Sequence, residues 1–329
     1  MSHSPSDHSM LPLSTTHLDG ATTSEDYTSL MLTDDKPNHA GPSSSNSQPP
    51  SRRIVLALLL ATSLVTLVFT AGPVLFELPQ MDGVWYVGND IVRLLEPIIA
   101  MPLYFALLVE SKVFDDRRQG YIVGTVFMIF AGIYQQGAGF HSASNMFKHP
   151  FKEYMDLNPS AVATDPFFAD FYYWLRTVWE HGVSHYLYAA GGVLMSMVLA
   201  YVYRDVCSPQ PHTAITMSTA RGADDMKWNM GDRVLWGIGA LLYGLIIGSV
   251  AINFPKGSIV ALVLILAYGA GVVGTFVIRK EGVRGTFALG RRYVLQWYLT
   301  AYTIALIVVI GWIIHAKGFD NREEAGIKF

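Results

Sequence analysis

The sequence has little charge and almost no cysteine for its length. Only 15% of its 329 residues are Asp, Glu, Lys or Arg, whereas 51% are hydrophobic, and the mean hydropathy is +0.31. Such a composition does not suit an ordinary water-soluble domain, so the lipid bilayer is the expected surroundings. The single cysteine, Cys207, excludes an internal disulfide and a zinc site built from thiolates. Any metal would need His and carboxylate ligands.

Several functional classes are excluded in the same way. The cations stand at the ends of apolar segments rather than in a patch that could follow phosphates, so nucleic acid is not an expected partner. A retinal protein would require a Lys in its last transmembrane helix, and the last apolar segment of this sequence contains none. The membrane domain also lacks the large His cluster of di-iron lipid desaturases and hydroxylases.

Three regions follow from composition. Residues 1–52 are rich in Ser, Thr, Pro, Asp and His and show no apolar periodicity, which predicts a disordered cytosolic tail. Residues 53–316 form the predicted transmembrane domain, and residues 317–329 a short C-terminal tail. No lipidation signal is evident at either terminus.

A helix needs about 20 mostly apolar residues to cross a hydrocarbon core roughly 30 Å thick. The sequence predicts an all-α, polytopic integral membrane bundle of seven such helices. They are Ile54–Phe76, Val84–Val109, Gly120–Phe140, Phe168–Tyr203, Val234–Phe254, Ser258–Ile278 and Tyr293–His315.

The loop cations predict an orientation. Lys and Arg are more frequent before the first span and in the loops after the second, fourth and sixth spans than on the opposite side. By the positive-inside rule the N-terminus is cytosolic, and seven spans place the C-terminus in a lumen or outside the cell. The sequence does not say which membrane this is.

Ionisable side chains inside spans are costly, and here they gather in one layer. A rise of 1.5 Å per residue from the cytosolic ends places His141, His181, His185 and His315 about 28 to 34 Å along their helices, with Glu96 at about 24 Å. Four helices therefore bring polar groups to the outer third of the membrane.

This layer predicts a metal site. His181 and His185 are four residues apart on one helix, so both can face a single ion, and His141 is the best third ligand. Zinc with three protein ligands and an open position is the expected ion, with Glu96 as a further candidate ligand. Glu180 or Glu96 is then the candidate catalytic base.

Three further residues belong to the candidate site as outer partners: Asn145, Ser184 and His315. Two other interpretations of the layer stay open. One is a functional pocket without metal, and the other is a structural cluster that ties helices together in lipid. An ion pair between Arg93 and Glu96, three residues apart, would remove Glu96 from the site.

The segment GAGFHSASN, which contains His141, is similar to the corresponding segment of seven-helix membrane hydrolases of the alkaline ceramidase and adiponectin-receptor kind. The similarity covers one helix, and those families place their His-x-x-x-His pair near the last helix rather than in the fourth. It implies only that three histidines in a seven-helix bundle can hold zinc for amide hydrolysis.

The leading hypothesis is a zinc-dependent hydrolase or another lipid-modifying enzyme, with a lipid or other amphipathic molecule as its substrate. One alternative is a transporter coupled to protons or divalent cations, which should show polar residues or broken helices toward the cytosolic half. The other is a receptor or scaffold without catalysis, in which the His cluster is structural.

Overall fold

The structure, a computed structural model, describes residues 51–76, 78, 88–204, 228–275 and 292–327. All of them belong to the compact unit Ser47–Phe329. The predicted tail 1–52 lies outside the described residues except for its last two positions, and so do the predicted start of the second span and the predicted end of the sixth.

Within these ranges the regular elements are all helical. Along the chain they are α1 (Arg52–Leu75), α2 (Gly88–Glu110), the 3₁₀ turn η2 (Val113–Asp115), α3 (Arg117–Leu157), α4 (Pro159–Thr164), α5 (Phe167–Trp174), the π-helix η3 (Leu175–Ser184), α6 (His185–Val202), α7 (Met230–Ala251), α8 (Gly257–Val272) and α10 (Tyr293–Ala316).

Seven helical runs in the described part of the chain are long and apolar enough to cross a membrane. They are α1, α2, α3, the continuous run α5–η3–α6, α7, α8 with a short extension, and α10. The predicted fold class is therefore confirmed: the protein is an all-helical integral membrane bundle with seven transmembrane helices.

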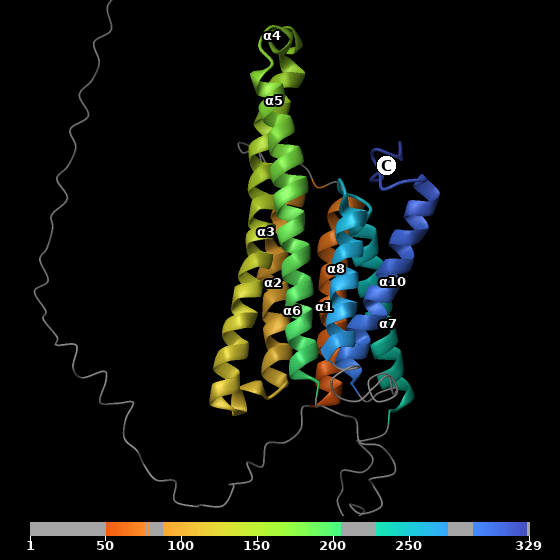
Figure 1. The fold of residues 1–329 in the computed structure, drawn as a ribbon. Helices are drawn as coiled ribbons and strands as arrows, with labels where there is room; N and C mark the ends of the chain where they lie inside the picture. Colours follow the sequence, from red (N-terminus) through yellow and green to blue (C-terminus); the bar gives the residue numbers. More distant parts are fainter. Residues whose placement is uncertain (1–50, 77, 79–87, 205–227, 276–291, 328–329) are drawn as a thin grey trace, which may run out of the picture. The chain divides into compact units, whose positions relative to one another are not determined.

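The spans alternate in direction (Figure 1). Helices α1, α3, α7 and α10 run toward the end of the bundle where the C-terminus lies, and α2, α6 and α8 run away from it. Helix α3 packs against α6 and α2, whereas α1 contacts both α2 and α7, and α10 packs on α7. We call the end at which α2 begins and α7 finishes the C-terminal end of the bundle.

Helix α3 has 41 residues, about 62 Å of helix, and so is much longer than a membrane requires. Its last turns pair with α5 beyond the other helices at the C-terminal end (Figure 1). Rings from both helices meet there, with Phe151 4.9 Å from Phe171 and Tyr154 4.4 Å from Phe168 between centroids. Aromatic packing thus stabilises this extension.

Two glycines let α3 and α6 approach closely. A Cβ on Gly137 would lie 2.5 Å from the backbone nitrogen of Tyr188, and one on Gly191 would lie 2.5 Å from that of Tyr134. Only a residue without a side chain fits such a backbone contact between membrane helices. The contact holds the rings of Tyr134 and Tyr188 side by side, with centroids 4.2 Å apart.

Candidate functional site

A polar cavity of about 310 Å³ lies near the C-terminal end of the bundle. Its walls come from α1, α2, α3, η3, α6, α7 and the segment after α10. The lining residues are Phe69, Thr70, Arg93, Glu96, Gly137, Ala138, His141, Ser142, Glu180, His181, Ser184, His185, Tyr188, Val250, Asn253, Phe254, Arg322 and Glu323.

The cavity brings together the three histidines and the two glutamates that the sequence singles out. The ring centroids of His141 and His185 are 5.1 Å apart, and those of His181 and His185 are 6.0 Å apart. His185 is also stacked on Phe254, with ring centroids 4.7 Å apart and an interplanar angle of 8°. Because Phe254 follows α7 closely in the chain, this stacking fixes the orientation of the His185 ring against the end of α7.

The arrangement does not fit a zinc ion as it stands. No three His, Cys, Asp or Glu side chains among the described residues form a group that could hold a metal. The amide nitrogen of Asn145 lies 3.1 Å from Nδ1 of His141. An amide NH₂ only donates, so in the neutral ring the proton is on Nε2, which then cannot bind a metal. Zinc would require this amide and the rings to turn.

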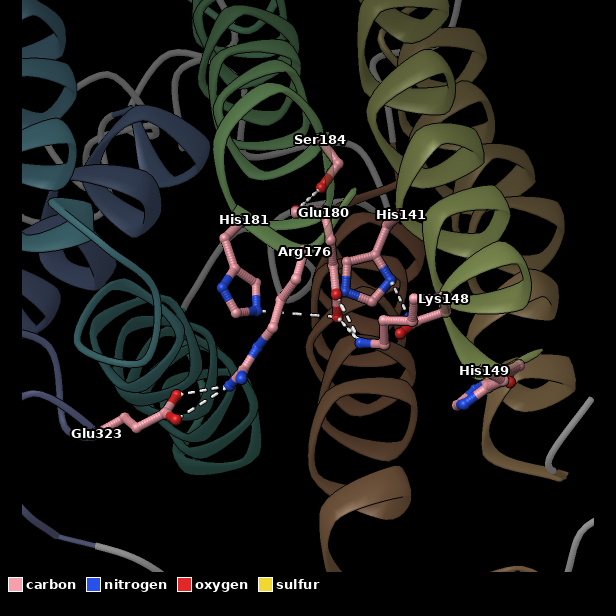
Figure 2. Close-up of polar contacts among 10 residues, drawn as sticks. His141, Lys148, His149, Arg176, Glu180, His181, Ser184 and Glu323 are labelled. Carbon is pink, nitrogen blue, oxygen red and sulfur yellow. Dashed lines mark hydrogen bonds and ion pairs between the residues drawn. The ribbon is translucent and has the colours of Figure 1, made fainter. Parts of the chain in front are cut away.

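Glu180 is engaged by a lysine (Figure 2). Nζ of Lys148 donates to both carboxylate oxygens of Glu180, at 2.7 and 2.5 Å. Nε2 of His181 is 3.8 Å from Oε1 of the same carboxylate, which is beyond hydrogen-bonding distance. Both members of the ion pair are largely buried, so Glu180 in this state is a charge partner rather than a free base.

Glu96 is held by hydroxyl groups instead of a cation. Tyr134 donates to Oε1 of Glu96 at 3.1 Å, and Tyr188 donates to the same oxygen. The Tyr134 hydroxyl also lies 2.6 Å from that of Tyr188. Arg93 forms no ion pair with Glu96, although both side chains line the cavity.

The three outer residues lie in different surroundings. Asn145 is buried against His141, as a residue that orients the ring should be. Ser184 is buried as well, but its hydroxyl donates to the backbone carbonyl of Glu180 in its own helix. His315 is exposed on the last turn of α10 beside Trp312 and is not part of the cavity wall.

The segment after α10 closes one side of the cavity. The backbone N–H of Arg322 donates to the carbonyl of Ile252 at the end of α7, over 2.9 Å. Next to it, Glu323 accepts from Nη2 of Arg176 at 3.0 and 2.8 Å, a pair visible in Figure 2. The predicted C-terminal tail therefore contributes two lining side chains.

A second, apolar pocket of about 70 Å³ adjoins the cavity toward the middle of the bundle. Thr70, Tyr188, Val250 and Phe254 line both spaces. Otherwise the apolar pocket is formed by Thr66 of α1, by tyrosine and aliphatic side chains of α2, α3, α6, α7, α8 and α10, and by two glycines. The two spaces together have one polar and one apolar part.

No role is expected from the sequence for Lys148, Tyr134 or Tyr188, and Arg93 is expected there only as an ion-pair partner of Glu96. A signal for Lys148 exists in its spacing, because it follows His141 by seven residues and so lies on the same helix face. This spacing is informative only if the helix is predicted to continue past Phe140, where the predicted third span ends. The tyrosines give no such signal, since their meeting with Glu96 depends on how three helices pack.

The chain matches no protein-family model, no curated protein and no solved structure.

Proposed function

We propose that this protein is a membrane-embedded enzyme that modifies the polar part of a lipid or a similar amphipathic molecule. The observation that carries the proposal is the junction between the His-rich cavity and the apolar pocket, which have Tyr188 and Phe254 in common. A space with a polar and an apolar part suits a molecule of the same kind. Hydrolysis of an ester or amide in the polar part is the favoured reaction.

The side chains of the cavity can supply acid–base chemistry. His185 can accept a proton from water and return it to a leaving group, and the neighbouring His141 ring, whose Nε2 carries the proton, can donate a hydrogen bond beside it. Glu96, buried and hydrogen-bonded by two tyrosines, is the second candidate base. Lys148 neutralises Glu180 and so leaves that carboxylate a positioning role beside His181.

A zinc-dependent form of the proposal differs in one requirement. His141, His181 and His185 would have to turn toward a common point, and the Asn145 amide would have to reverse. The metal content of the purified protein distinguishes the two forms.

The orientation belongs to the same proposal. The excess of Lys and Arg on the side where α1 begins supports a cytosolic N-terminal tail. The cavity, at the opposite end, then faces a lumen or the cell exterior, and its substrate enters from that leaflet.

A transporter would need a path to the other end of the bundle. The pocket described there is lined by Asp116, Arg118, Gln119 and neighbouring residues of α3 and α6. It has no lining residue in common with the two spaces at the C-terminal end. This separation favours the enzyme over the transporter.

The test is a turnover assay on the purified full chain in mixed micelles with ester-linked and amide-linked lipids, with products identified by mass spectrometry. We expect H185A and E96Q to slow product formation by about 100-fold or more, because each substitution removes a proton-transferring group. H315A is the matched control, since His315 lies outside the cavity wall, and it should keep the wild-type rate.

Zinc is measured in the same samples. Stoichiometric zinc that is lost in H141A, H181A and H185A supports the zinc-dependent form, and turnover without zinc supports the other. The proposal is contradicted if the wild type turns over no lipid of either class, or if H185A and E96Q are as fast as the wild type.

A further inference from the structure

Arg93 is a cation of the cavity wall that forms no close ion pair with a carboxylate of the described residues. It lies in the second turn of α2, half-buried, and its side chain lines the cavity. Among the residues that the structure describes, Arg93 has neither an ion-pair partner nor a hydrogen bond. A guanidinium group within a membrane span is costly unless an anion accompanies it.

The carboxylates of the same wall are engaged elsewhere. Glu96 accepts from Tyr134 and Tyr188. Glu180 is paired with Lys148, and Glu323 with Arg176. Each of these three acidic groups thus has a closer partner than Arg93, and Glu96, whose donors are neutral, interacts with Arg93 only electrostatically and beyond ion-pair distance. The guanidinium of Arg93 therefore keeps its hydrogen-bond donors for a ligand in the cavity.

Hydrogen-bond donors accompany this charge. With Nδ1 of His141 accepting from Asn145, the ring presents N–H at Nε2. His181 and His185 add two more rings to the same wall. Arg with neighbouring N–H donors is the arrangement that recognises the oxygens of a phosphate or carboxylate, because the planar guanidinium can donate two parallel hydrogen bonds.

From this geometry we infer that the ligand of the cavity is an anionic amphiphile, whose phosphate or carboxylate pairs with Arg93 and whose apolar part enters the adjoining pocket. The inference rests on the proposed function, since it names the substrate class of the same site. It adds a requirement that the proposed function lacks, namely a negative headgroup. The apolar pocket favours an amphiphile over free inorganic phosphate.

The test measures binding to the purified full chain in phosphatidylcholine nanodiscs. The probes are dodecyl phosphate, dodecyl maltoside, which has the same chain and no charge, and inorganic phosphate. We expect dodecyl phosphate to bind the wild type at least about 10-fold more tightly than either of the others. R93Q should lose this advantage, and R93K should keep part of it.

R117Q is the matched control, because Arg117 is exposed at the start of α3, at the opposite end of the bundle. It should bind all three probes as the wild type does. If R93Q does not fold, R93K tests the role of Arg93, and the comparison of the charged and uncharged probes on the wild type tests the anionic headgroup.

Failure of this inference is distinguishable from failure of the proposed function. The variant V193W fills the apolar pocket, which Val193 lines. If both dodecyl probes bind equally tightly and V193W abolishes their binding, the preference for an anionic headgroup is overturned. The cavity would then still be a binding site for an amphiphile. Inorganic phosphate that binds as tightly as dodecyl phosphate would overturn the amphiphile. Dodecyl phosphate binding that R93Q leaves unchanged would overturn the role of Arg93.

Discussion

Glu96 and Glu180, two carboxylates of the cavity wall, are satisfied in different ways, and the difference decides what their partners contribute. Glu96 receives neutral hydroxyl donors from α3 and α6, whereas Glu180 receives the ammonium group of Lys148. A hydrogen bond to a charged group contributes about 1.5 to 3 kcal/mol to the free energy of unfolding. Removing one partner of a buried ion pair lowers that free energy by about 3 to 5 kcal/mol. The lysine should therefore matter more for stability than either tyrosine.

Tyr188→Phe tests the hydroxyl clamp on Glu96. The substitution removes one donor from a buried carboxylate, so we expect the free energy of unfolding to fall by about 1 to 3 kcal/mol. Thermal and denaturant unfolding in detergent micelles measure this. Tyr186→Phe is the control, because the Tyr186 hydroxyl makes only a 3.4 Å contact with the carbonyl of Pro255. Equal effects of the two substitutions would contradict the clamp.

Lys148→Met tests the ion pair. It leaves Glu180 buried without its cation, and we expect a loss of about 3 to 5 kcal/mol in the free energy of unfolding. The double variant K148M/E180Q should be more stable than K148M, because the uncompensated charge is gone. Lys152→Met, one turn further along α3 and exposed, should change little. A double variant less stable than K148M would refute this explanation.

At the scale of elements, the contact between α3 and α6 determines the shape of the site. Gly137 and Gly191 allow these helices to approach until Tyr134 and Tyr188 are only 4.2 Å apart between ring centroids. Gly137 is one helical turn before His141 and faces Ser184 and Tyr188. Any change that separates the two helices should therefore also separate the histidines.

Gly137→Ala tests this contact against Gly132→Ala in the same helix. The new methyl group at 137 would overlap backbone atoms that cannot move aside, so we expect a loss of about 1 to 3 kcal/mol despite better helix propensity. Gly132 has no atom within 4 Å of an added Cβ, so alanine there should gain up to about 1 kcal/mol. Unfolding in micelles measures both, and a stabilised G137A would contradict the close approach.

The sequence predicts the spans well because hydropathy and length suffice for them. It underestimates α3, whose continuation after Phe140 is polar and contains Pro150. That continuation depends on rings such as Phe151 meeting Phe168 and Phe171 of α5, a tertiary contact that no local pattern reveals. Hydrophobic pattern thus locates membrane helices but not the parts of helices that leave the membrane.

For the site, helix depth predicts that His141, His181 and His185 reach one level, and the structure places all three in one cavity wall. Depth does not give side-chain direction. The expectation that His181 and His185 face one ion assumes α-helical geometry at both positions, but His181 lies in the π-helix η3. A π-helix shifts the hydrogen-bond register to i→i+5, which the sequence does not signal here.

At the scale of the whole molecule, the site lies at one end of the bundle and a buried ion pair at the other. There, Arg52 at the start of α1 binds Asp232 of α7 at 2.8 Å, and its guanidinium lies 5.5 Å from the centre of the Trp228 ring. Which end faces the cytosol decides from where a substrate arrives.

The single cysteine makes this orientation testable in the natural sequence. Cys207 follows α6 in the chain, outside the described residues, and the distribution of Lys and Arg predicts that it is cytosolic. In intact cells or sealed vesicles with the native orientation, we expect a membrane-impermeant maleimide to label Cys207 only after permeabilisation. The paired variant carries Ser160→Cys on exposed α4, at the opposite end, in a Cys207→Ser background. It should be labelled without permeabilisation, whereas the reverse result would place the cavity on the cytosolic side and its substrate in the inner leaflet.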